Sequence, residues 1–267
     1  MTPSRRLQLH AALFAALVVV SVAGPWLYHA DPDLLDFARA TAPPSAQHPL
    51  GTDESGRDVL ARLLAGGRVS LAAGAAAMLL AVAAGTVVGA LAALSRPRVD
   101  AVLMRLTDAA LAIPAIFVVI TVLTFLGPSV PTLVLTIGAT SWMGLARLVR
   151  GELLALRHQD FVEAAVALGA PPLDRFRRHL LPHLWPTILV NATLGMGTAL
   201  LTESALSFLG LGVQPPAASW GNMLSGAQSS LFNAPWLAVA PGLMILLAVV
   251  AINLLGDALR DLLHPGE

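Results

Sequence analysis

Long apolar stretches with almost no charge constrain this chain more than any other feature. A helix that crosses about 30 Å of hydrocarbon needs roughly 20 mostly apolar residues. Only 12% of the 267 residues are charged and 56% are hydrophobic, whereas about 25% of the residues in soluble domains are charged. The sequence therefore predicts an all-α membrane protein with six transmembrane helices, at residues 9–28, 70–94, 107–126, 132–149, 188–206 and 236–255.

Glycine and proline within these spans predict how two of them pack. The second span carries Gly74, Gly85 and Gly89, which predict small faces where neighbouring helices approach closely. Pro114 lies inside the third span and predicts a kink, because proline frees a backbone carbonyl that neighbouring helices or water must satisfy.

The fifth span is the least apolar, since it contains Asn191 and Glu203. Polar residues inside a span are expected to face protein or water. Both residues are candidates for the lining of a translocation path. For Glu203, a structural carboxylate hydrogen-bonded to neighbouring helices is the alternative.

The distribution of arginine predicts the orientation of the spans. All sixteen basic residues are arginines, and twelve of them fall on the side that holds both termini if there are six spans. Positive residues are enriched in cytoplasmic segments, so both termini are predicted to be cytoplasmic. The first span is predicted to be retained, with a cleaved signal peptide as the alternative.

Lysine and cysteine are both absent. The lack of lysine excludes a Walker-type phosphate loop, so any ATP must be bound by another chain. The lack of cysteine excludes disulfides and thiolate metal sites. His179 and His183 are too few for a metal site, and none is predicted. His10, at the start of the first span, is the only histidine in the six spans, which disfavours an intramembrane enzyme. The formal net charge of zero gives no basic field for nucleic acid.

We treat residues 1–267 as a single transmembrane domain with two long segments between spans. In the outer segment, Val59, Leu60, Leu63 and Leu64 predict a short amphipathic helix. The acidic residues of that segment are expected to solvate the surface, with attraction of cations as the alternative.

The cytoplasmic segment 150–186 predicts two short helices with a hinge. Residues 160–168 are strong helix formers, and Gly169 can end a helix in the left-handed conformation. Pro171 and Pro172 suit the first turn of a second helix, and Pro182 is expected to end it. Such a pair could dock on a partner protein or anchor the segment at the membrane surface.

This segment resembles the EAA loop of binding-protein-dependent importers. The resemblance rests on Glu163-Ala164-Ala165, Gly169 and His179-Leu180-Leu181-Pro182 at the spacing of that loop. His179 departs from the general pattern but is common in the peptide-permease branch. The resemblance implies coupling helices seated in a cleft of a cytoplasmic ATPase. The residues that match are Glu163, Ala164, Ala165, Gly169, Leu181 and Pro182.

Segments 48–71, 201–224 and 253–265 resemble the dipeptide, oligopeptide and nickel branch of these importers. The resemblance implies a C-type permease subunit with the type I ABC importer fold, a multi-pass protein of the bacterial inner membrane. It also implies a second homologous permease subunit, two ATPase subunits that bind ATP and magnesium, and an external substrate-binding protein. This chain would itself bind no cofactor.

We therefore expect a permease subunit that imports di- or oligopeptides and is not itself an enzyme. Import of nickel or glutathione by the same family is an alternative. A stand-alone secondary transporter is a further alternative, which the nearly charge-free spans disfavour.

Overall fold

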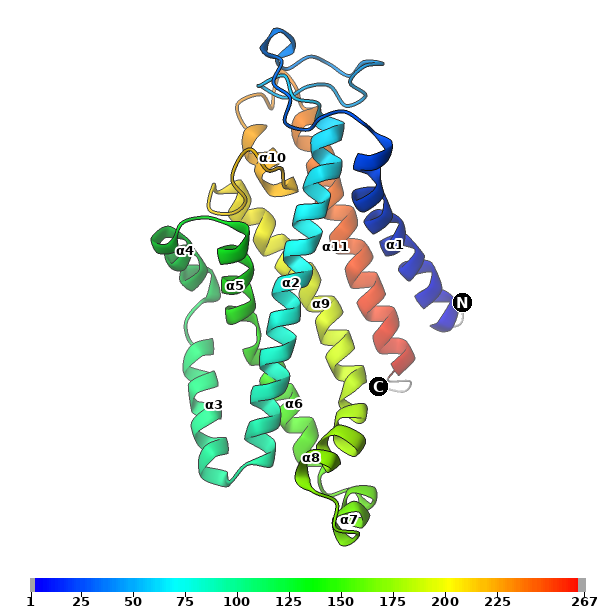
Figure 1. The fold of residues 1–267 in the computed structure, drawn as a ribbon, viewed down its shortest axis with the longest axis vertical. Helices are drawn as coiled ribbons and strands as arrows, with labels where there is room; N and C mark the ends of the chain where they lie inside the picture. The colour runs from blue at the N-terminus through cyan, green and yellow to red at the C-terminus, as the bar shows by residue number, and fades with distance from the viewer. Residues whose placement is uncertain (1–2, 264–267) are drawn as a thin grey trace.

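The computed structural model describes residues 3–263, which form an elongated bundle of helices (Figure 1). Within these residues the only β-pairing is a single bridge between Thr52 and Asp58. The helices in chain order are α1 (Pro3–Leu27), the 3-10 turn η1 (Phe37–Arg39), α2 (Val59–Leu94), α3 (Pro97–Leu111), α4 (Ala115–Leu126), α5 (Val130–Ser141), α6 (Met143–Leu156), α7 (Asp160–Ala167), α8 (Pro172–Arg175), the π-helical turn η2 (Phe176–Leu180), α9 (Leu181–Phe208), α10 (Trp220–Gly226) and α11 (Trp236–Leu263).

The predicted all-helical, multi-span architecture is confirmed. Five helical rods among the described residues are long and apolar enough to cross a membrane, and there are six such spans if the bent pair α3 and α4 is counted as one. The rods are α1, α2, α5 with α6, α8 with α9, and α11. The chain runs up and down the long axis of the bundle, and both ends lie in the half from which α7 and α8 project (Figure 1).

The third span is two helices rather than one kinked helix, which corrects the prediction. Helix α3 begins at Pro97 and ends at Leu111, and α4 leaves it at 79°. Pro114 is the N-cap of α4. A proline disfavours the helical conformation of the residue before it, and it cannot donate the hydrogen bond that would continue α3.

The helix predicted from Val59, Leu60, Leu63 and Leu64 is present, but it is not short, because its residues are the first turns of α2. Asp58 is the N-cap, and its carboxylate accepts a hydrogen bond from the Ala61 amide at 2.8 Å. From there α2 continues without a break to Leu94. Val59, Leu63 and Leu64 are buried, so the apolar stripe faces the bundle interior.

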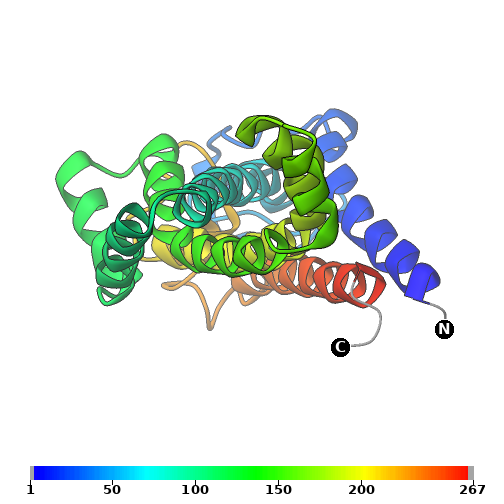
Figure 2. The ribbon, with the colours of Figure 1, turned by 90° about the horizontal axis from the view of Figure 1, so that it is seen from below.

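Helix α2 lies in the middle of the bundle, as the view along its length shows (Figure 2). A Cβ atom added to Gly85 would lie 2.7 Å from the Trp142 carbonyl oxygen, and one added to Gly89 would collide with the Ala146 carbonyl. These two glycines therefore let α6 approach α2 closely. Gly74 faces Leu200 of α9 less closely, since an added Cβ atom would lie 3.4 Å from the Leu200 amide nitrogen, an ordinary contact. The predicted small face is confirmed at Gly85 and Gly89.

Candidate functional site

A cavity of about 500 Å³ opens between α2, α4, α5, α6 and α9. The residues that line it are either apolar or polar without charge. Helix α9 contributes hydroxyl and amide groups to the wall through Asn191, Thr198 and Thr202. Thr140 and Ser141 add hydroxyls from α5. The other lining residues are Met78, Ala115, Ile116, Val119, Ile137, Gly144, Leu145, Leu194, Gly195 and Ala199.

A second cavity of about 610 Å³ lies next to the first, toward the cytoplasmic end, and its lining is charged. Arg147, Glu152 and Arg260 line it together with Thr187. Asn191 lines both cavities, and its side-chain amide donates to the Thr187 carbonyl at 2.9 Å. The predicted candidate Asn191 thus lies where a neutral cavity meets a charged one.

Ion pairs between α3 and α6 fix the wall of this second cavity. The Arg150 guanidinium donates to both carboxylate oxygens of Asp100, at 2.5 and 2.6 Å. Arg147 pairs with Asp108 one turn of α6 earlier. Two-point pairing of this kind fixes geometry as well as charge, so α3 is held to α6 through side chains.

Glu203 lies among hydroxyl groups and lines neither cavity. Its side chain is fully buried, and its carboxylate accepts from Ser207 at 2.7 Å and from Ser204 at 3.3 Å. Ser70 of α2 and Ser219 beside α10 also interact with it. A buried carboxylate needs such donors. The geometry therefore matches the structural alternative for Glu203, a joint between α9, α2 and α10.

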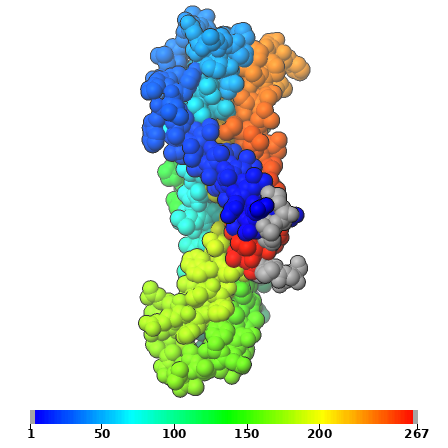
Figure 3. Space-filling view, turned by 90° about the vertical axis from the view of Figure 1, so that its right-hand side faces the viewer, coloured from blue at the N-terminus to red at the C-terminus, as the bar shows by residue number. Residues whose placement is uncertain are grey.

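The α7–α8 segment, residues 157–182, projects beyond the rest of the bundle at its cytoplasmic end (Figure 3). Helix α7 ends at Ala167, and Gly169 has a φ of +76°. Only glycine adopts this left-handed conformation at little cost, so the predicted hinge is confirmed. Pro172 then begins α8, as its fixed φ angle favours.

The prediction that Pro182 ends the second short helix is wrong. Helix α8 passes through the π-helical turn η2 directly into α9, so that Pro172–Phe208 is one rod of 37 residues. In η2 the Leu181 amide bonds to the carbonyl of Phe176, five residues back. Pro182 follows in the first turn of α9, so its missing amide falls where the π-helical turn already changes the hydrogen-bond register.

The six residues that match the EAA pattern are not all on one surface. Four of them are exposed: Glu163, Ala164, Gly169 and Pro182. Ala165 is on the buried face of α7. Leu181 is half-buried against the hydrophobic core at the cytoplasmic end of the bundle. The pattern therefore combines a surface that a partner can reach with residues that hold this surface in place.

The α7–α8 segment exposes apolar side chains that the sequence motifs do not indicate. Leu168 is 88% exposed, Leu173 is 64% exposed and Val166 is 50% exposed. Helix α7 is tied to the start of α9 by the stacked rings of Phe161 and His183, with centroids 4.8 Å apart. Helical spacing gives no signal for Val166, because it is four residues after buried Val162 and is expected on the same face of α7.

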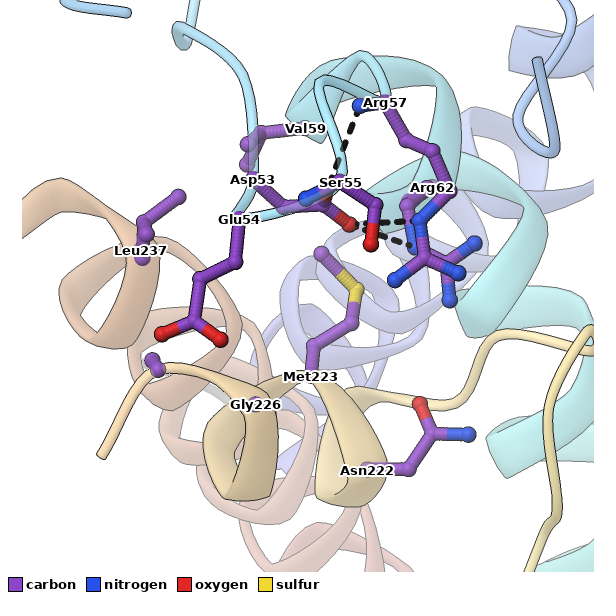
Figure 4. Close-up of a pocket in the computed structure, with 11 residues that line it drawn as sticks. Asp53, Glu54, Ser55, Arg57, Val59, Arg62, Asn222, Met223, Gly226 and Leu237 are labelled. Carbon is purple, nitrogen blue, oxygen red and sulfur yellow. Dashed lines mark hydrogen bonds and ion pairs between the residues drawn. The ribbon is translucent and has the colours of Figure 1, made fainter. Parts of the chain in front are cut away.

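At the opposite end, the outer segment (residues 28–58) is held by charged side chains around a small cavity (Figure 4). The Asp53 carboxylate accepts from Arg57 at 2.7 Å and lies 3.6 Å from Arg62. Arg62, which is buried, also pairs with Asp33 at 3.2 Å. The expectation that the acidic residues only solvate the surface is therefore wrong for Asp53.

Asp58 connects three parts of the chain at this end of the bundle. Its second carboxylate oxygen lies 2.8 Å from both the Tyr28 hydroxyl and His48 Nδ1. Burial, together with the hydrogen bond and the negative charge of Asp58, raises the pKa of Tyr28 to about 12. Asp58 therefore joins the end of α1, the outer segment and the first turn of α2.

Residues 85–267 match the family described as "Binding-protein-dependent transport system inner membrane component". The oligopeptide transport system permease protein OppC of Haemophilus influenzae is 36% identical over 96% of this chain and 83% of its own length. The glutathione transport system permease protein GsiD of Escherichia coli O157:H7 is 40% identical over 98% of this chain and 87% of its own.

Among solved structures, an inward-facing conformation of the MetNI methionine ABC transporter has a similar fold. The TM-score is 0.59 at 23% sequence identity, over 75% of this chain and 95% of that one. At this identity the likeness concerns the fold alone.

Proposed function

Because the chain belongs to the family of binding-protein-dependent transport system inner membrane components, we propose that it is the permease subunit of an ATP-driven peptide importer. Members of this family are multi-pass inner-membrane permease subunits and not enzymes themselves. The peptide cargo follows from the relatives, which are named for oligopeptide and glutathione transport.

One observation carries this proposal. Helix α8, which begins at the α7–α8 junction, and the α9 wall of the neutral cavity belong to the same helical rod. The rod runs from Pro172 to Phe208. Its cytoplasmic end follows the exposed Glu163 and Gly169, and its middle carries Asn191, Thr198 and Thr202. A movement imposed on the α7–α8 segment is therefore transmitted to the cavity through the backbone of one helical rod, in which Pro182 and Pro186 each leave out one amide hydrogen bond.

The mechanism is a two-state bias imposed from outside the membrane domain. Two ATPase subunits hold the α7–α8 segments of this chain and of a second, homologous permease subunit. Closure of the ATPase pair on ATP moves these segments and favours the outward-facing arrangement of the spans. Substrate released by the external binding protein enters the cavity, and hydrolysis restores the inward-facing state. Coupling requires only that the closed ATPase pair binds one of the two states of the membrane domain more tightly than the other.

The six EAA residues have separate roles in this proposal. Exposed Glu163 offers a charge to the ATPase cleft, and Ala164 permits close approach. Gly169 sets the angle between α7 and α8. Ala165 and Leu181 pack the segment against the bundle. Pro182 lies in the first turn of α9, where the segment joins the long rod. The chain supplies no phosphate loop, since it has no lysine, so ATP and magnesium belong to the partners.

The lining of the cavities supports a peptide in preference to a bare metal ion. Hydroxyl and amide groups on Thr140, Asn191 and Thr198 can exchange hydrogen bonds with a peptide backbone. In the second cavity Arg260 can attract the carboxylate of a peptide and Glu152 its amino group, while Arg147 is already paired with Asp108. Nickel, which the family resemblance also allows, would need a path lined by carboxylates or histidines.

Uptake in cells that lack the chain tests the proposal. Labelled dipeptide, longer peptide, glutathione and nickel are supplied separately, and cells are restored with wild type, Glu163→Arg or Asp261→Arg. Asp261 is half-exposed on α11 and pairs weakly with Arg6 at 3.9 Å, so its reversal is the matched control. We expect peptide or glutathione uptake with wild type and Asp261→Arg, and its loss with a correctly inserted Glu163→Arg protein.

Each other outcome removes a specific part of the proposal. Nickel uptake alone would replace peptide as the cargo. Undiminished uptake with Glu163→Arg would remove the docking role of that residue and favour a membrane-surface anchor. Uptake that continues when the ATPase subunits are deleted would favour a stand-alone secondary transporter.

A further inference from the structure

A third cavity, of about 360 Å³, lies between the cytoplasmic ends of α2 and α6 and the α7–α8 segment. It is separate from the two cavities assigned to transport. Arg157 and His158 line it from the end of α6, Arg175 from α8, and Ser95 from the end of α2. No acidic residue is among its lining residues. The cavity is therefore a basic site bounded by both the bundle and the projecting segment.

The positive charges in this cavity are not neutralised by the parts of the chain that the structure describes. Neither Arg157 nor Arg175 forms an ion pair in residues 3–263. The nearby carboxylate of Asp100 is already held by both donors of Arg150. Arg157 Nε donates to His158 Nε2 at 3.0 Å, which leaves the other guanidinium nitrogens available.

Arg175 gives a second, independent indication of a missing partner. Its Nε atom is buried and has no hydrogen-bond partner. Leaving a buried donor unpaired is costly, most of all on a charged group. A role as a helix C-cap accounts for Arg157, which follows the last turn of α6, but it does not account for the buried nitrogen of Arg175.

The rest of the cavity wall is apolar. Leu94 and Val166 line it and are about half exposed. The site also lies at the cytoplasmic ends of two membrane-spanning rods, where headgroups of the inner leaflet are within reach. Basic pockets between transmembrane helices on this side bind anionic headgroups. A wall of arginine and leucine fits a molecule with an anionic head and an apolar body.

We propose that this cavity binds the phosphate headgroup of an anionic phospholipid from the cytoplasmic leaflet. Arg157 and Arg175 hold the phosphate, since the planar guanidinium matches phosphate oxygens at two points. Leu94 and Val166 contact the glycerol and the first part of the acyl chain. A lipid held there ties the ends of α2 and α6 to the α7–α8 segment, and so restrains the segment that contacts the ATPase.

Lipid binding is measured on the full chain, purified in detergent and stripped of lipid. Short-chain phosphatidylglycerol, short-chain phosphatidylcholine and inorganic phosphate are titrated while thermal unfolding and native mass spectra are recorded. We expect phosphatidylglycerol to raise the melting temperature and to appear as a bound adduct, and the other two to do much less. The Arg157→Gln/Arg175→Gln double variant should bind phosphatidylglycerol about tenfold more weakly or worse.

Arg178→Gln is the matched control, because Arg178 is exposed in η2 and does not line the cavity. Arg175→Lys retains the charge and should retain part of the binding, which separates loss of the site from loss of the fold. Equal binding by wild type and the double variant would overturn the proposal. So would an equal effect of phosphatidylcholine, an equal effect of inorganic phosphate alone, or displacement of the lipid by purified ATPase subunits, which would make the cavity part of the ATPase contact.

Discussion

The outer segment and the α7–α8 segment are both long connections between spans, yet they are stabilised in opposite ways. In the outer segment buried Asp58 binds Tyr28, His48 and the Ala61 amide, and buried Arg62 is shared between two carboxylates. The α7–α8 segment forms no ion pair within residues 3–263 and is held by the packing of Val162 and Leu180. Both segments expose apolar side chains, such as Leu34 and Leu168, but among the described residues only the outer segment pairs its charged groups with one another.

This difference predicts that substitutions in the two segments will change different measured properties. Changes in the outer segment should lower the free energy of unfolding and leave ATPase coupling intact in the protein that folds. Changes on the α7–α8 surface should leave unfolding unchanged and weaken association with the ATPase.

The largest expected effect is that of Asp58→Ala on stability. The change removes the N-cap of α2, worth about 1 kcal/mol, and leaves Tyr28 and His48 without their shared acceptor, so the total loss should be about 3 kcal/mol. Thermal unfolding of the purified chain measures it. Asp36→Ala is the control, because its pair with Arg39 at 3.4 Å is exposed and should contribute less than about 1 kcal/mol. Equal stability of the two variants would contradict the assigned role of Asp58.

The next effect belongs to the α7–α8 surface. Leu168→Asp should weaken association with the ATPase subunits about 30-fold, since burial of a leucine stabilises a complex by about 2 kcal/mol. The melting temperature should not change, because Leu168 is 88% exposed. Co-purification and a binding titration measure the association. Leu34→Asp, at an exposed leucine of the outer segment, should bind the ATPase normally. Normal binding by Leu168→Asp would place the ATPase elsewhere.

A smaller effect is expected at the hinge. Gly169→Ala should reduce uptake severalfold, because a left-handed conformation costs a residue with a Cβ about 1 kcal/mol, and α7 will shift to relieve it. No steric clash contributes, since nothing lies within 4 Å of the added atom. Gly169→Asn should restore part of the uptake, because asparagine tolerates this conformation. Gly226→Ala, also without close neighbours, is the control, and an equal loss there would reject the conformational explanation.

The smallest effect is the pH dependence that Tyr28 gives to the outer segment. Its pKa rises from 10.0 to about 12 through burial and the contact with Asp58. The unfolded chain therefore loses this proton first, so stability should be constant below pH 10.0 and should fall as the pH rises toward about 12. Tyr28 is the only tyrosine, so an ultraviolet titration reports it alone. A normal pKa, or one unchanged in Asp58→Ala, would contradict the contact.

Hydropathy was sufficient to predict the spans, because membrane helices must be apolar over a fixed length. It could not predict their continuity. The break at Pro114 and the passage through Pro182 involve the same residue type, and they differ because Pro182 lies in a first turn next to the π-helical turn η2. Gly169 was predictable, since few residues adopt its conformation. The hydroxyl cage of Glu203 was not, because Ser70 and Ser219 are distant in sequence and come together only when α2 packs against α9.

The π-helical turn η2 has a consequence for the angular register of the long rod. Each residue added to a regular α-helix turns everything beyond it by about 100°, which would rotate the α7–α8 surface away from the face that carries Asn191 and Thr198. A π-helical turn takes up one additional residue within a single turn. Residues Phe176–Leu180 are thus the point where the rod can gain or lose one residue without turning the α7–α8 surface relative to the face of α9 that carries Asn191 and Thr198.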